Sequence, residues 1–325
     1  MRKHPFISPD SCHNSSIIYK LFQIGNTPLI ISSSILDKIE IYRGVNIMRI
    51  IKYLLLLSLL IVLSVSAWIY YPQYKLNKIM EQSTTKVTNT NKLTYLDYYR
   101  ESNDKTITHL ALGDSIIHGY KVAEKENLVT QFSDQLHIQT GKQVFTNNRG
   151  IIGITSQKLN QLVQEGNFDE EIKEADIITV NVGGNDVLRA VKKADLYSAL
   201  KSFDSLQTNF RKNLSGISEK ISQLNPDATI VFLELYNPMP ADHQFYSLAD
   251  KLLPKWNLMI YEEANNTPSA VVVQTTKVIN SDNLQNLYSD GVHPSISGYS
   301  AISNQMLEQF KTQYKEEAVV ANSKK

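Results

Sequence analysis

From Thr106 onward, short apolar runs alternate with stretches of helical spacing, and this alternation restricts the fold more than any other feature of the chain. Such an alternation is typical of an α/β domain with a mainly parallel sheet. The predicted strands are 107–112, 143–146, 175–182, 228–236 and 270–275, and the predicted helices are 127–140, 156–164, 194–224, 248–265 and 297–314. With 42% hydrophobic and 20% charged residues, the composition is that of an ordinary globular protein with a packed core.

Polar residues follow directly after several of the predicted strands. Ser115 follows the first strand, Gly150 lies in a glycine-containing loop after the second, and Asn185 follows the third. Asp290 and His293 follow the last strand. The carboxyl ends of parallel strands lie at one edge of the sheet, where ligands usually bind. The sequence therefore predicts that these distant residues converge in space.

The residue types at this edge fit acyl transfer by a serine nucleophile. Ser115 would be a weak nucleophile by itself and needs a base, and His293 can both take and return a proton. Asp290 lies three residues earlier, which on a helical turn puts both side chains on one face, where the carboxylate fixes the tautomer of the ring. The N–H groups of Ser115 and Gly150 and the side-chain amide of Asn185 are candidate donors to an oxyanion. Each motif alone is also typical of a turn or a helix cap.

Taken together, four short blocks resemble those of the GDSL/SGNH hydrolases. In order, they are Gly113-Asp114-Ser115, Asn148-Arg149-Gly150, Gly183-Gly184-Asn185-Asp186 and Asp290-Gly291-Val292-His293-Pro294. The resemblance covers about 106–314 and implies a three-layer α/β/α flavodoxin-like fold with a mainly parallel sheet. It also implies that Ser115 is the nucleophile, that Gly150 and Asn185 complete the oxyanion hole, and that Asp290 holds the base His293. Ile116 stands where the family name has leucine, which is a conservative change.

The predicted function is hydrolysis of carboxylic esters through an acyl-enzyme on Ser115, without metal or cofactor. Two substrate classes stay open: a lipid or lysophospholipid, and an O-acetyl group on a cell-envelope polysaccharide. A further alternative is a non-catalytic surface binding module on the same fold, which is disfavoured because the chain keeps every catalytic residue type. No substrate-binding residue is specified. The segment 238–256 is a candidate lid or acyl-site wall, with ordinary helix packing as the alternative.

An almost wholly apolar run at 53–71 precedes the domain. Its length matches the roughly 20 residues that a helix needs to cross a bilayer, and Trp68 and Tyr71 near its end suit the membrane interface. We favour an uncleaved single-pass anchor over 48–71 with the catalytic domain outside the cell, because the apolar run continues past Ala67. The alternative is a signal peptide cleaved after Ala67, which would give a secreted protein. A buried core helix is disfavoured because no polar face interrupts the run.

The other segments flank the membrane run and the domain. Residues 1–47 are predicted to be an extension of unknown structure, upstream of a natural start at Met48. A polar linker is predicted over 72–105, with a short helix at 74–80. The hydrolase domain is predicted over 106–317, and 318–325 is a polar tail.

Charge, cysteine content and missing motifs exclude several function classes. The formal net charge is +1, and no basic run is interleaved with aromatic residues, so no nucleic-acid partner is expected. The single cysteine, Cys12, excludes an intramolecular disulfide and a cysteine metal cluster. A Gly-x-Ser-x-Gly elbow is missing, which argues against an α/β-hydrolase arrangement. Two residues call for an explanation: His118, which could line the site, and Glu234, which is unusual within an apolar strand.

Overall fold

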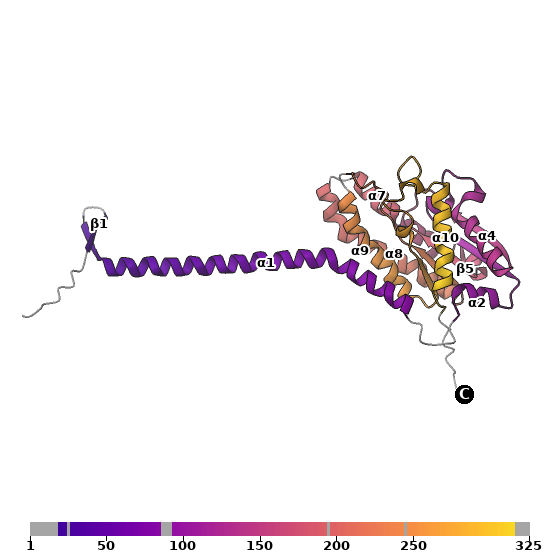
Figure 1. Ribbon diagram of the computed structural model, residues 1–325, viewed down its shortest axis with the longest axis horizontal. Helices are drawn as coiled ribbons and strands as arrows, with labels where there is room; N and C mark the ends of the chain where they lie inside the picture. The colour runs from indigo at the N-terminus through magenta and orange to yellow at the C-terminus, as the bar shows by residue number, and fades with distance from the viewer. Residues whose placement is uncertain (1–18, 25–26, 86–92, 194–195, 244–245, 316–325) are drawn as a thin grey trace, which may run out of the picture. The chain divides into compact units, whose positions relative to one another are not determined.

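The computed structural model describes residues 19–24, 27–85, 93–193, 196–243 and 246–315, which form two compact units, 1–68 and 69–325 (Figure 1). Among its described residues, the first unit contains an antiparallel hairpin of β1 (Tyr19–Ile24) and β2 (Thr27–Ser32). Helix α1 (Ser33–Thr85) follows. The sequence shows no clear period over the hairpin and does not predict it.

Helix α1 carries the apolar run that was assigned to the membrane. Within the described part of the chain, one segment, Asn46–Glu81, is long and apolar enough to cross a membrane. None of its most apolar window is buried, and side chains such as Leu57 and Leu60 are more than half exposed. These properties agree with a transmembrane or signal segment.

The second unit is built on a five-stranded parallel sheet of order β4-β3-β5-β6-β7. Its strands are β3 (Thr106–Gly113), β4 (Gln143–Gly150), β5 (Ile177–Asn181), β6 (Thr229–Leu233) and β7 (Ala270–Val273). Every residue of β5 and β6 is buried, which explains their near-continuous apolar sequences. Numbered from β3, the strand order is 2-1-3-4-5, the order of flavodoxin-like folds.

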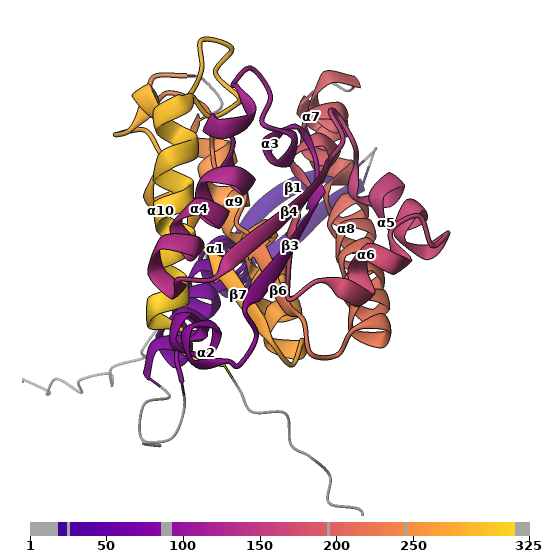
Figure 2. The ribbon, with the colours of Figure 1, turned by 90° about the vertical axis from the view of Figure 1, so that its right-hand side faces the viewer.

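Helices cover both faces of this sheet and give three layers (Figure 2). On one face, α2 (Tyr95–Glu101), α4 (Leu128–Thr140) and α10 (Ile296–Thr312) bury a cluster that includes Phe132 and Phe310. On the other face, α5 (Ser156–Gln164), α6 (Asp169–Glu174), α8 (Leu196–Leu224) and α9 (Tyr246–Asn266) bury a cluster that includes Phe210 and Trp256. The predicted three-layer α/β fold is therefore confirmed.

Two element boundaries next to the site differ from the prediction. Strand β4 continues through Asn148 to Gly150, which the sequence predicts as a loop, because it pairs with β3 as far as Gly113. A separate helix, α7 (Gly184–Lys193), begins within the block that ends the third predicted strand, whereas the next helix that the sequence predicts begins at 194. Asn185 therefore lies in the first turn of a helix.

Part of the predicted linker over 72–105 belongs to the folded domain instead. Helix α1 runs through its first part and buries Leu76 in the core cluster. Helix α2 buries Tyr95, Leu96 and Tyr99 against the opposite cluster. The composition of the segment is polar, but a few apolar side chains on one helical face are enough to dock a short helix.

His109 lies in the middle of β3, and its ring is completely buried. Its Nδ1 is 2.9 Å from Ser133 Oγ, and its Nε2 is 2.8 Å from Thr179 Oγ1. Burial lowers the pKa of His109 to about 3, so the ring stays neutral between its two hydroxyl partners. The residue is a satisfied core histidine.

We expect acid to destabilise the wild type more than a His109→Gln variant. Below its ordinary pKa of 6.5 the unfolded chain binds a proton on His109 that the folded chain does not accept. The free energy of unfolding therefore loses about 2 kcal/mol from this residue between pH ~7.5 and ~5.

Urea unfolding of both proteins at the two pH values measures the difference. Burial raises the pKa of Asp114 and Glu234, which acts in the opposite direction but equally in both proteins. Equal losses of stability in the two proteins would contradict the prediction.

Candidate active site

Ser115 is the first residue of the short helix α3 (Ser115–His118), which follows β3 directly. Asp114 caps this helix: its carboxylate accepts the N–H of Ile116 at 2.9 Å and the side-chain amide of Asn181 at 3.1 Å. Ser115 itself is only 7% exposed. The strand on one side and the capped helix on the other therefore define the position of the Ser115 hydroxyl.

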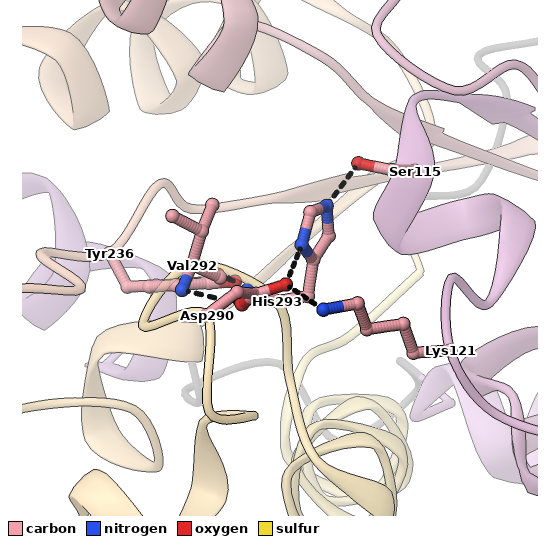
Figure 3. A network of polar contacts seen from close by, with 6 residues as sticks. All are labelled: Ser115, Lys121, Tyr236, Asp290, Val292 and His293. Carbon is pink, nitrogen blue, oxygen red and sulfur yellow. Dashed lines mark hydrogen bonds and ion pairs between the residues drawn. The ribbon is translucent and has the colours of Figure 1, made fainter.

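His293 reaches Ser115 from a loop near the other end of the chain (Figure 3). Its Nε2 is 2.9 Å from Ser115 Oγ, and its Nδ1 is 2.9 Å from Asp290 Oδ2. An Nδ1–H that is donated to Asp290 leaves Nε2 able to accept the proton of Ser115. The structure thus brings the three predicted residues into one continuous chain of hydrogen bonds.

Asp290 and His293 meet through a turn that precedes α10, whereas the spacing argument used the geometry of a helical turn. Asp290 Oδ1 accepts the N–H groups of Val292 and His293, both at 3.0 Å. The Tyr288 N–H donates to His293 O at 2.7 Å, and the Tyr236 hydroxyl donates to Val292 O at 2.7 Å. Because one carboxylate oxygen holds the turn while the other meets the ring, no helix is needed to bring the side chains together.

The charge of Asp290 is stabilised by more donors than the sequence predicts. Burial opposes the charge, but the N–H groups of His293 and Val292, the Lys121 ammonium and the His293 ring outweigh it and lower the pKa of Asp290. Lys121 Nζ lies 2.9 Å from Asp290 Oδ2. Sequence reasoning missed Lys121, because no spacing rule connects a residue just after α3 with one near the C-terminus.

Asp114 is a second titratable group next to Ser115, and it is almost completely buried. Burial raises its pKa to about 7, although the Ile116 N–H and the Asn181 amide both favour the charged form. The phenols of Tyr236 and Tyr299 are also affected by its charge, and their pKa is raised first by their own burial. The site therefore contains one carboxyl that stays ionised and one that titrates near neutral pH.

Gly150 and Asn185 lie at the same sheet edge as Ser115, since Gly150 ends β4 and Asn185 follows β5. The Gly150 N–H donates to Asn148 Oδ1 at 2.9 Å. Asn185 Nδ2 donates to Ile154 O at 3.1 Å. A side-chain amide carries two N–H bonds, so Asn185 retains one for a further acceptor. To donate to an oxyanion, the Gly150 N–H would have to be shared with Asn148 Oδ1 or released from it.

The loop between β4 and α5 is tied to α7, the helix that carries Asn185. Asp186 accepts the Ser156 hydroxyl at 2.7 Å and the Ser156 N–H at 2.9 Å. Arg189 donates to Gly153 O at 2.6 Å. These contacts hold the two segments that carry Gly150 and Asn185 together.

His118 and Glu234, which call for an explanation in the sequence, lie within hydrogen-bond distance of neighbouring groups in the fold. His118 is exposed, with Nδ1 3.3 Å from Gly150 O. Glu234 is buried and accepts the Tyr261 hydroxyl at 3.0 Å and the Thr276 hydroxyl at 2.6 Å, which ties β6 to the segment after β7. Among the described residues, no group of three or more His, Cys, Asp or Glu side chains could hold a metal ion.

The candidate acyl wall over 238–256 is in part core packing. Trp256 is only 2% exposed, and its ring centroid lies 5.7 Å from that of Phe203 and 5.3 Å from that of Phe210. Leu252 and Leu253 pack against the same cluster. Ordinary helix packing therefore accounts for this end of the segment, and residues 244–245 lie outside the described residues.

Residues 111–301 match the GDSL-like Lipase/Acylhydrolase family. The spore germination lipase LipC of Bacillus licheniformis is 27% identical over 206 residues, which cover 62% of this chain and 95% of LipC. The uncharacterized protein YpmR of Bacillus subtilis is 25% identical over 215 residues, which cover 64% of this chain and 84% of YpmR. The crystal structure of a lipase from a goat rumen metagenome has a TM-score of 0.57 and 26% identity, and the match covers 62% of this chain and 97% of that lipase.

Proposed function

We propose a serine acyl-enzyme mechanism for this chain, which belongs to the GDSL-like lipase/acylhydrolase family and is a carboxylic ester hydrolase. The observation that carries the proposal is the chain of hydrogen bonds from Asp290 through His293 to Ser115, with 2.9 Å at each step. A hydroxyl so close to a ring nitrogen can lose its proton to that nitrogen as it attacks.

In the first half of the reaction, Ser115 Oγ forms a bond to the ester carbonyl carbon while His293 Nε2 takes the hydroxyl proton. The bond from that carbon to the alcohol oxygen then breaks, and His293 gives the proton to the leaving alcohol. Water repeats the sequence on the acyl-enzyme and releases the acid and free Ser115. Asp290 stays ionised throughout and stabilises the imidazolium.

The negative charge of the tetrahedral intermediate needs donors, and we assign the N–H groups of Ser115 and Gly150 and the amide of Asn185 to this task. Ser115 is the first residue of α3, where N–H groups have no partner within the helix. The second N–H of Asn185 and a Gly150 N–H released from Asn148 would complete the set. Losing one donor of this kind typically costs about a hundred- to a thousand-fold in rate.

We expect Ser115→Ala to lose labelling by a fluorophosphonate probe and nearly all turnover of p-nitrophenyl esters. Turnover should fall by a factor on the order of 10⁴ to 10⁶, because the nucleophile is removed. Ser300→Ala is the matched control, since the Ser300 hydroxyl bonds Gln131 in the α4 and α10 layer and takes no part in the mechanism. A non-catalytic binding module would leave the wild type unlabelled, and wild-type rates in Ser115→Ala would refute the mechanism.

For the substrate, we propose a lipid ester with an acyl chain longer than acetyl. Ile151 and Ile152 follow Gly150 directly and are 39% and 54% exposed. They lie in a turn closed by the Ile154 N–H and Ile151 O at 3.1 Å, and Arg189 and Asn185 hold this turn from α7. Two exposed isoleucines in a loop that begins at one candidate oxyanion donor and is bonded by another offer apolar contact to an acyl chain. The names of LipC and of the rumen lipase point in the same direction.

We expect the double variant Ile151→Ser, Ile152→Ser to shift the preference toward short esters. The ratio of kcat/KM for p-nitrophenyl octanoate to that for the acetate should fall on the order of tenfold, about 1.4 kcal/mol of lost apolar contact. Ile138→Ser is the matched control, because Ile138 is 74% exposed on α4. An acetate preference in the wild type would instead support the alternative, an O-acetylesterase acting on cell-envelope polysaccharide.

We also propose that α1 is an uncleaved anchor and that the catalytic domain lies outside the cell. The candidate span Asn46–Glu81 and the unbroken helix past Ala67 support an anchor. Mass spectrometry of the mature protein should recover a peptide that crosses the Ala67–Trp68 bond. A mature N-terminus at Trp68 in the culture medium would show secretion after cleavage instead.

A further inference from the structure

Lys121 follows α3 by three residues and reaches across to the loop that carries the candidate base (Figure 3). Its Nζ lies 2.9 Å from Asp290 Oδ2, and the two side chains are 30% and 25% exposed. Its ammonium also lies 4.4 Å from the ring centroid of Tyr288 and 5.5 Å from that of Tyr120. Three independent contacts therefore hold one lysine next to the triad.

The backbone at Lys121 is held in an unusual conformation. Its φ is +69°, and it is the one non-glycine residue with positive φ in the described part of the chain. It lies within a turn closed by the Val122 N–H and Gly119 O at 3.3 Å, where glycine is the usual residue at positive φ. Strain of this kind persists only where the surroundings enforce it, and it clusters at functional sites.

The four donors around Asp290 divide between its two oxygens. Oδ1 takes the N–H groups of Val292 and His293, while Oδ2 takes both the His293 ring and the Lys121 ammonium. The oxygen that orients the imidazole is thus the same oxygen that the lysine holds. Tyr120 adds to this arrangement, because its ring centroid lies 4.5 Å from that of His293.

We propose that Lys121 is a positioning residue of the hydrolase, which fixes Asp290 Oδ2 against the His293 ring and offsets part of the carboxylate charge at the site. The proposal rests on the serine mechanism above. An ammonium at contact distance makes proton uptake by the site harder at a given pH. Lys121 would thereby keep the base in its working form at lower pH.

Other titratable groups around Asp290 and His293 also affect how the activity depends on pH. Burial raises the pKa of Asp114 to about 7, so its charge changes near neutral pH, while the phenols of Tyr236 and Tyr299 stay neutral because burial raises their pKa. The titratable groups on the segments around Asp290 and His293 are Lys121, Tyr120, Tyr288, Tyr236, Tyr299, Asp114 and His118. All of these groups except Lys121 are unchanged in a Lys121 variant. A comparison with the wild type therefore isolates the effect of the Lys121 ammonium on the pH dependence.

The test is the pH profile of kcat/KM for a p-nitrophenyl ester, measured on the full chain in detergent. In Lys121→Met the acid limb should move to higher pH by about half to one pH unit. In addition, kcat should fall about tenfold with little change in KM, because a misplaced ring affects the chemical step. Lys121→Arg should retain most of the wild-type pH profile and most of the wild-type kcat, because arginine keeps the positive charge. Lys125→Met is the matched control, since Lys125 is exposed in the next segment of the chain.

Lys121→Gly guards against misfolding, because glycine suits a φ of +69°. It should show the same change in the pH profile as Lys121→Met while keeping the wild-type melting temperature. If the profiles of Lys121→Met and Lys121→Gly coincide with that of Lys125→Met, the inference is wrong, although the serine mechanism stands. Failure of the wild type to react with a fluorophosphonate probe would instead overturn the mechanism on which the inference rests.

Discussion

Strand β3 is hydrogen-bonded on both sides, and the geometry of the site is set at its last residue. Gly113 is level with Gly150 of β4 and with Asn181 of β5. A Cβ at Gly113 would lie 2.3 Å from Asn181 O, so only glycine lets the strands pass this closely. The Asp114 N–H then donates to Asn181 O at 3.1 Å, and its carboxylate caps α3. Ser115 therefore directly follows a turn whose position is determined by backbone pairing.

The other half of the site depends on a loop that is held by side chains. Asp290 organises this loop through one oxygen and meets the His293 ring through the other. Tyr236 ties the loop to the end of β6, and Lys121 ties it to the segment after α3. The proposed nucleophile on a rigid strand end and the proposed base on a cross-linked loop are thus within hydrogen-bond distance before a substrate binds, which would reduce the cost of orienting them.

The local sequence pattern was sufficient to predict most of the secondary structure of the fold, but not the secondary structure next to the site. Strands β5 and β6 are apolar because both their faces are buried, and α4 ends at Gly141 as its sequence predicts. The end of β4 is polar yet paired, because an edge strand needs no apolar run. Helix α7 starts inside Gly183-Gly184-Asn185-Asp186, where glycine and asparagine favour a turn by local preference. Asp290 and His293 meet through an Asx turn, which their three-residue spacing alone cannot distinguish from a helical turn.

By itself, the sequence determined the α/β class, the apolar segment within α1, and the identity of the polar residues that follow each strand, since periodicity and strand ends are properties of neighbouring residues. Tertiary structure alone decided that Lys121 meets Asp290 and that Asp114 is buried enough to titrate near neutral pH. These features depend on burial and on contacts between segments that are distant in the chain or packed by the fold, and a linear pattern carries no information about either.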